Sequence, residues 1–209
     1  MSIYLARHGQ TDWNLEFRIQ GRSDIPLNRT GEMQAAELYA NLVKDGAEIA
    51  RIYSSTLSRA YKTASIVGEK YGVPVIKIPG LEEVDFGLFE GHTWDEVYAE
   101  YTRIHSDWSL DKFRRKDHGG ESYVDMLKRF LAAFEQIKEE SEDVLGAGRD
   151  ILIVAHFSSI MSLLTIREGL DFRDSYKYVG PGNAEPVKFE IDELDFLLSK
   201  GLSQGEESV

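Results

Sequence analysis

The stretch IYLARHG, residues 3–9, places a short apolar run directly before an arginine and a histidine. The run Ile3–Ala6 is typical of a buried strand. A second apolar run, DILIVA at residues 150–155, also predicts a strand and is followed by His156. Ligands of open α/β sheets bind beyond the carboxyl ends of parallel strands. If the two strands are parallel neighbours, His8 and His156 meet at one edge of the sheet.

Strand and helix patterns alternate along the rest of the chain. Further strands are expected at residues 51–54, 74–78 and 186–191. Helical spacing of apolar residues predicts helices near residues 30–45, 58–72, 121–140 and 158–168, and Thr93-Trp94-Asp95-Glu96 predicts a capping box at the start of another. This alternation predicts an α/β fold: a three-layer α/β/α sandwich with a mostly parallel central sheet flanked by helices.

The chain has 209 residues and shows no linker and no internal repeat. One domain is therefore expected over residues 1–200. Residues 92–120 are rich in aromatic side chains and are predicted to form a small helical cap insertion beside the site; two ordinary surface helices are the alternative. The polar segment 201–209 is expected to be a disordered tail.

Acidic residues outnumber basic ones by 36 to 24, which gives a net charge of −12. This balance argues against a nucleic-acid partner, because such partners need clustered Lys and Arg. A local group of Arg and His can still bind a small anion, since surface charge is screened beyond about 8 Å. No cysteine is present, which excludes disulfides and thiolate chemistry and fits a cytoplasmic protein. Apolar runs end far short of the roughly 20 residues that cross a bilayer, so no membrane association is expected.

Arg7 beside His8 suits phosphoryl transfer. A guanidinium binds a phosphate dianion through paired charge-assisted hydrogen bonds. Nearby cations also disfavour protonation of His8, so its pKa is expected to be low and its lone pair free to attack phosphorus.

A hydrolysis also needs a proton for the leaving oxygen, and the loop LEEVDFGLFEG at residues 81–91 offers four carboxyls. The residues alone do not choose among Glu82, Glu83, Asp85 and Glu90, and a solvated acidic loop is the alternative. A metal site is not expected, because no close ligand pair such as HExxH occurs. The glycine-rich phosphate loops and the GxSxG of serine hydrolases are also absent.

Six ordered motifs resemble one family, and the resemblance spans about residues 3–164. They are LARHGQTDWN at 5–14, RIQG at 18–21, DIPL at 24–27 with Gly31, YSSTLSRA at 53–60, LEEVDFGLFEG at 81–91 and VAH at 154–156. Together they resemble the signature of the histidine phosphatase superfamily, also called the phosphoglycerate mutase-like family.

This resemblance implies a role for each matching residue. His8 would be the nucleophile and form a phosphohistidine, and Glu83 would protonate the leaving group and then activate water. The remaining residues would bind phosphate: Arg7, Arg59 and His156 directly, with Asn14, Gln20 and Gly21 lining the pocket. The implied chemistry needs no metal. One departure is Phe157, where many members carry glycine; it is expected to narrow the pocket or to move a backbone contact to another amide.

The compact length favours a metal-independent phosphatase acting on small phosphomonoesters. The pattern GGES at residues 119–122 is common in short members, including α-ribazole phosphatase-like proteins. One alternative is a cofactor-dependent phosphoglycerate mutase, which would need a 2,3-bisphosphoglycerate primer, whereas a phosphatase needs no cofactor. A second alternative is a non-catalytic member that binds phosphorylated ligands. The expected protein is a cytoplasmic monomer or homodimer.

A run of cations lies within the predicted cap. It either binds a second acidic group of the substrate or is a solvated surface run. Its members are Lys112, Arg114, Arg115 and Lys116.

Overall fold

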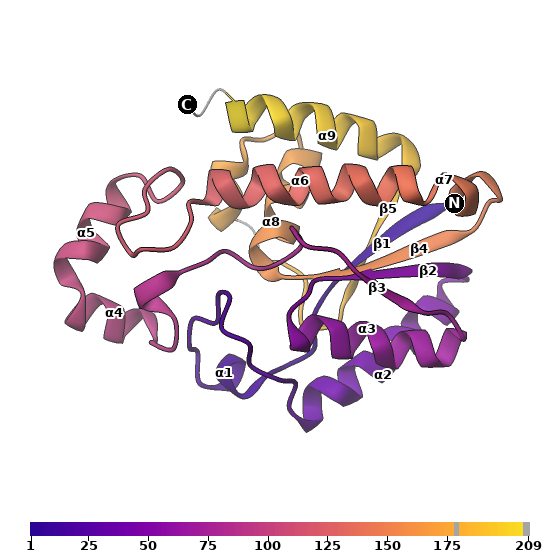
Figure 1. Ribbon diagram of the computed structural model, residues 1–209, viewed down its shortest axis with the longest axis horizontal. Coiled ribbons are helices and arrows are strands. Elements are labelled where there is room, and N and C mark those ends of the chain that lie inside the picture. The colour runs from indigo at the N-terminus through magenta and orange to yellow at the C-terminus, as the bar shows by residue number, and fades with distance from the viewer. Residues whose placement is uncertain (178–179, 207–209) are drawn as a thin grey trace.

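A sheet of five strands forms the centre of the computed structural model, which describes residues 1–177 and 180–206 (Figure 1). The strands are β1 (Ser2–Arg7), β2 (Ile49–Ser54), β3 (Val75–Lys77), β4 (Asp150–Ala155) and β5 (Pro186–Glu190). Their order across the sheet is β3-β2-β4-β1-β5. The first four strands run parallel and β5 runs antiparallel beside β1. The predicted mostly parallel sheet is therefore confirmed.

Alternate residues of the central strand β1 face two separate cores. Ile3 and Leu5 pack into the core on one face of the sheet, and Tyr4 and Ala6 pack into the core on the other. All four side chains are almost completely buried. A strand covered on both faces reads as an unbroken apolar run, which explains the pattern in the sequence.

Helices cover both faces, as predicted (Figure 1). Helices α2 (Arg29–Lys44) and α3 (Ser58–Tyr71) lie on one face. The opposite face carries α6 (Tyr123–Glu140), α8 (Phe157–Arg167) and α9 (Ile191–Glu206). The shorter elements are α1 (Asp12–Leu15), α4 (Trp94–Glu100), α5 (Thr102–Leu110), α7 (Glu142–Gly146) and the 3-10 turns Gly87–Phe89 and Phe172–Lys177.

Residues 92–120, named the cap here, contain α4 and α5 and lie to one side of the sheet (Figure 1). The predicted capping box is present: the Thr93 hydroxyl accepts the Glu96 N–H, and the Glu96 carboxylate accepts the Thr93 N–H. Aromatic packing joins the two helices, since Trp94 stacks on Trp108 with ring centroids 5.6 Å apart.

The predicted disorder of residues 201–209 is wrong for residues 201–206, which continue α9 to Glu206. Gly201 is buried, and a Cβ there would lie 2.7 Å from Leu131 Cδ1. Leu197 and Leu198 anchor the preceding turn in the core. The polar composition of this segment does not predict its order. Its contact with α6 depends on Gly201, which has no side chain, rather than on an apolar side chain. Residues 207–209 lie outside the described part of the chain.

Within the described residues, no helix combines the length and apolar character needed to span a membrane.

Candidate active site

The two histidines lie at the carboxyl ends of neighbouring parallel strands. Arg7, the last residue of β1, pairs in register with Ala155, the last residue of β4. The His8 N–H donates to the Ala155 carbonyl at 3.1 Å. The rings of His8 and His156 consequently lie 5.2 Å apart between centroids. The juxtaposition predicted from the two apolar runs is confirmed.

His8 is held in one tautomer by its own loop. Its Nδ1 lies 2.7 Å from the Gly9 carbonyl oxygen. A carbonyl can only accept, so Nδ1 carries the hydrogen and Nε2 keeps its lone pair. Burial, followed by the charges of Arg59 and Arg7, holds the pKa of His8 well below its usual value. The ring is therefore a neutral imidazole whose Nε2 is available as a nucleophile.

Gly9 keeps the carbonyl that orients His8 in place. Its N–H donates to Thr63 Oγ1 at 2.9 Å. A Cβ on Gly9 would lie only 2.4 Å from the Gly31 carbonyl oxygen, so the close approach of these two backbones requires glycine.

Two buried guanidiniums flank the imidazole. Arg59, fully buried on α3, donates to the carbonyls of Ser23 at 2.8 Å and Gly21 at 2.7 Å. Burial lowers the pKa of Arg59 to about 10, which leaves it protonated at neutral pH. The Nε groups of Arg59 and Arg7 are buried without an acceptor in the described chain. Buried cations are costly unless paired, so this site suits a dianion such as phosphate.

Two carboxamides add neutral donors, and both are set by Thr11. The Thr11 hydroxyl lies 3.2 Å from Asn14 Oδ1 and 3.0 Å from Gln20 Oε1. With their oxygens facing this hydroxyl, the amide NH₂ groups remain to donate to an anion. Thr11 belongs to the first motif, but sequence reasoning gave it no role.

Of the four candidate acids in loop 81–91, Glu83 alone lines the site cavity in the described structure. The other three acids accept hydrogen bonds elsewhere. Glu82 accepts from Thr56 Oγ1 at 2.6 Å, Asp85 accepts from the Gly87 N–H at 2.9 Å, and Glu90 accepts from the Arg22 N–H at 2.8 Å. The geometry thus distinguishes the acid that the residue pattern alone left open.

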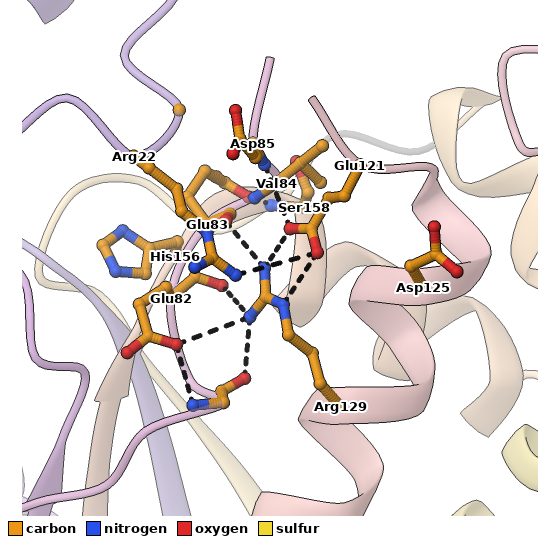
Figure 2. A network of polar contacts seen from close by, with 12 residues as sticks. Arg22, Glu82, Glu83, Val84, Asp85, Glu121, Asp125, Arg129, His156 and Ser158 are labelled. Carbon is orange, nitrogen blue, oxygen red and sulfur yellow. Dashed lines mark hydrogen bonds and ion pairs between the residues drawn. The ribbon is translucent and has the colours of Figure 1, made fainter. Parts of the chain in front are cut away.

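Arg129 of α6 fixes the backbone that carries Glu83 (Figure 2). Its guanidinium donates to the carbonyls of Gly80 at 2.8 Å, Glu82 at 2.7 Å and Glu83 at 2.7 Å. Glu121 holds the guanidinium from the other side, at 3.0 Å from Nε. Sequence reasoning missed Arg129. The GGES pattern offers a usable signal, because its glutamate, Glu121, lies eight residues earlier and binds the Arg129 guanidinium.

The Glu83 carboxylate is itself anchored by backbone donors. Oε1 accepts from the Val84 N–H at 2.9 Å, and Oε2 accepts from the Ser158 N–H at 3.2 Å in the first turn of α8 (Figure 2). The helix start that follows His156 therefore positions the acid as well.

These groups converge on one cavity of about 310 Å³, named the site cavity here. Of the residues predicted for the site, eight line it: Arg7, His8, Asn14, Gln20, Gly21, Arg59, Glu83 and Phe157.

His156 lies behind this lining and is completely buried. Its Nε2 is 2.9 Å from Ser55 Oγ, and its Nδ1 has no partner among the described residues. Burial and the charge of Arg59 hold the pKa of His156 well below its usual value. The His156 ring, next to that of His8, thus keeps one nitrogen that can contact a phosphoryl oxygen.

Phe157, which stands where many relatives carry glycine, packs against Arg7. Its ring centroid is 5.2 Å from the Arg7 guanidinium carbon. The Gly180 backbone also approaches the ring, since a Cβ on Gly180 would lie 2.7 Å from Phe157 Cε2. Phe157 therefore forms part of the cavity wall beside the Arg7 guanidinium.

The cap contributes Trp94, Lys112 and Phe113 to the site cavity, which places the predicted cap beside the site. The other members of the cationic run form ion pairs with carboxylates. These pairs are Arg114–Asp111 at 3.3 Å, Arg115–Asp117 at 2.7 Å and Lys116–Asp125 at 2.5 Å.

Comparison with known proteins agrees with this geometry. The chain is 36% identical over 171 residues to the uncharacterized phosphatase PhoE of Bacillus subtilis (strain 168), covering 81% of this chain and 79% of that protein. It is 32% identical over 174 residues to the probable phosphoglycerate mutase GpmB of Escherichia fergusonii, covering 81% and 76%. The solved structure of a mycobacterial glucosyl-3-phosphoglycerate phosphatase with VO3 superposes with a TM-score of 0.77 at 31% identity, covering 90% of this chain and 92% of that one. A family model of the histidine phosphatase superfamily (branch 1) matches residues 3–200, and the chain belongs to that superfamily.

Proposed function

We propose that this histidine phosphatase hydrolyses small phosphomonoesters through a phosphohistidine on His8, without a metal. The observation that carries the proposal is the tautomer of His8. Its Nδ1–H is bound to the Gly9 carbonyl, and its Nε2 keeps a lone pair in a cavity that also holds two buried guanidiniums.

In the first step His8 Nε2 attacks phosphorus, so a P–N bond forms while the ester P–O bond breaks. Arg7 and Arg59 stabilise the charge on the phosphoryl oxygens through their unpaired Nε–H groups. Glu83 transfers a proton to the departing oxygen, which leaves as a neutral alcohol or phenol.

In the second step water enters the cavity that the alcohol has left. Glu83, now a carboxylate, accepts a proton from this water as its oxygen attacks phosphorus. The P–N bond breaks, inorganic phosphate leaves, and His8 returns to its neutral form. His156 donates from Nδ1 to a phosphoryl oxygen in both steps, since its Nε2 is occupied by Ser55.

The relative named a probable phosphoglycerate mutase supports one alternative, in which a second phosphoglycerate replaces water. A mutase primed by 2,3-bisphosphoglycerate must hold the carboxylate of its substrate as well as the phosphate. Lys112 is the one member of the cationic run that lines the described site cavity, which favours hydrolysis. A cytoplasmic location and a monomeric or homodimeric state stay predictions.

The test is phosphate release from p-nitrophenyl phosphate in the presence of a chelator. Wild type is compared with His8→Ala and with His92→Ala, a half-buried histidine outside the site cavity. We expect wild type and His92→Ala to release phosphate and His8→Ala to release none. Rapid quenching without acid, with radiolabelled substrate, should trap an acid-labile phosphoenzyme in wild type. The same experiment should trap none in His8→Ala.

Release that disappears with chelator would overturn the metal-independent mechanism. Failure of wild type to release phosphate, together with interconversion of 2- and 3-phosphoglycerate, would replace the phosphatase with the mutase. Absence of both activities and of the phosphoenzyme would leave a non-catalytic phospholigand-binding protein.

A further inference from the structure

A second cavity of about 660 Å³, named the outer cavity here, adjoins the site cavity on the cap side. Four residues line both cavities, so the two lie side by side at these side chains: Trp94, Lys112, Phe113 and Tyr123. The outer cavity extends from them along α5, past His105, Trp108 and Ser109.

The wall of the outer cavity is built from flat aromatic rings that other rings hold in place. Trp94 and Trp108 are stacked, with an interplanar angle of 12°. Phe113 lies edge-on to Phe172 at 5.5 Å and tilted against Tyr123 at 5.6 Å. Rings locked by such contacts need no rearrangement to accept a flat guest.

Lys112 stands where the two cavities meet. Burial lowers the pKa of its ammonium, which lies 5.3 Å from the centroid of the Phe113 ring. The junction thus offers apolar and aromatic surface with a single cation among its four lining residues.

The size of the two cavities bears on what the site holds. Small-molecule sites span about 300–1,000 Å³. The site cavity, at about 310 Å³, is at the lower end of this range. In the proposed mechanism the phosphoryl group fills its Arg7–Arg59 end. A leaving group larger than a single ring exceeds the remaining space, and the outer cavity is the adjoining space lined by the same aromatic residues.

We propose that the outer cavity binds the leaving group of the substrate, and that the preferred substrates are phosphomonoesters of planar, largely apolar alcohols or phenols larger than one ring. This inference rests on the proposed hydrolase function and adds the substrate class to it.

The test compares kcat/KM for 2-naphthyl phosphate and phenyl phosphate, two aryl esters that differ mainly by one fused ring. Wild type should favour the naphthyl ester by about tenfold, because the second ring is removed from water against Trp94 and Trp108. Ser109→Phe places a ring in the outer cavity without touching the site cavity. It should reduce the preference to less than about twofold while leaving phenyl phosphate unchanged. Ser106→Phe, on the same helix but outside both cavities, is the matched control and should keep the preference.

Equal kcat/KM values for the two esters in wild type would overturn the inference, as would an equal loss for both in Ser109→Phe. A binding arm separates this failure from failure of the proposed function. If wild type hydrolyses neither ester, calorimetry with 2-naphthyl phosphonate and phenyl phosphonate still reports on the outer cavity. Tighter binding of the naphthyl compound that Ser109→Phe abolishes would support the inference while overturning hydrolysis; equal binding would overturn the inference.

Discussion

The phosphate end and the cap end of this active site are built by different kinds of contact. At the phosphate end, His8, Arg59 and Glu83 are each fixed by hydrogen bonds to backbone groups. At the cap end, Trp94 and Phe113 are fixed by contacts between rings.

This difference separates two kinds of selectivity. Directed hydrogen bonds hold a charge in one place and tolerate little substitution, so the phosphate end should act on every substrate alike. Ring contacts hold a shape, so changes in the cap should alter which leaving group is preferred. Each prediction below tests whether a substitution acts on all substrates or on some.

Among substitutions that leave the nucleophile His8 in place, the largest effect is expected for Arg59→Met. This change removes one of two buried cations and the donors to the Gly21 and Ser23 carbonyls. The value of kcat/KM should fall by about 10³–10⁵-fold for every ester, since the arginine stabilises charge that all substrates share. Arg51→Met, which loses contacts with Asp143 and Glu140 away from the site cavity, should retain activity. A loss confined to some esters would break the comparison.

Glu83→Gln should cost about 10²–10⁴-fold in kcat/KM for alkyl phosphates, whose leaving oxygens need a proton. The loss should be much smaller for p-nitrophenyl phosphate, because nitrophenolate leaves without one. The slope of log kcat/KM against leaving-group pKa measures this difference. Glu82→Gln, a change in the neighbouring acid that accepts from Thr56, should leave the slope unchanged. An equal loss for all leaving groups in Glu83→Gln would contradict its role as general acid.

The strands and Arg59 show how much of the site could be predicted from the sequence. The strands could be predicted because β1 and β4 are buried on both faces, and the meeting of His8 with His156 followed from parallel neighbours. Arg59 could not be placed from the residues alone, since nothing local marks a guanidinium that binds carbonyls nearly forty positions earlier. It was identified through the family motif.

Contacts between distant elements account for what was missed. Arg129 reaches carbonyls 46 to 49 residues before it, and no periodicity in the chain connects them. Glu82 and Glu83 are adjacent and chemically identical, and only the fold directs one into the site cavity. Residues 201–206 were predicted as disordered because the evidence for order lay in Gly201 meeting Leu131 of another helix.

Arg129→Lys tests whether positioning of the acid can be separated from the acid itself. A lysine ammonium cannot reproduce the planar fork that binds the carbonyls of Gly80, Glu82 and Glu83. The kcat/KM for alkyl phosphates should fall about tenfold, and the leaving-group slope should steepen in the same direction as in Glu83→Gln. The control is Arg149→Lys, a surface arginine that also binds a backbone carbonyl. An unchanged slope with lower thermal stability would indicate a purely structural role.

The buried histidines should make the phosphate end sensitive to acid. The pKa of His156 is lowered in the folded state, so below about pH 6.5 the unfolded chain binds a proton that the folded chain does not. The free energy of unfolding should therefore decrease as the pH falls, by about 1 kcal/mol between pH 6.5 and 5.5 for this residue. Urea unfolding without phosphate measures the free energy of unfolding at both pH values. In His156→Asn the decrease between pH 6.5 and 5.5 should be smaller than in wild type by about 1 kcal/mol. An equal decrease in wild type and His156→Asn would show that His156 does not cause this loss of stability.

The smallest effect is expected at the junction of the two ends, for Lys112→Met. Lys112 lines both cavities, and Lys116 lines neither and forms an ion pair with Asp125 of α6. A partly solvated cation contributes up to about 1 kcal/mol to an ion pair. Lys112→Met should therefore lower kcat/KM about threefold for 3-phosphoglycerate, whose leaving group carries a carboxylate, and leave phenyl phosphate unchanged. Lys116→Met should change neither substrate. An equal loss of kcat/KM for both substrates in Lys112→Met would show that the lysine acts on the phosphate and not on the leaving group.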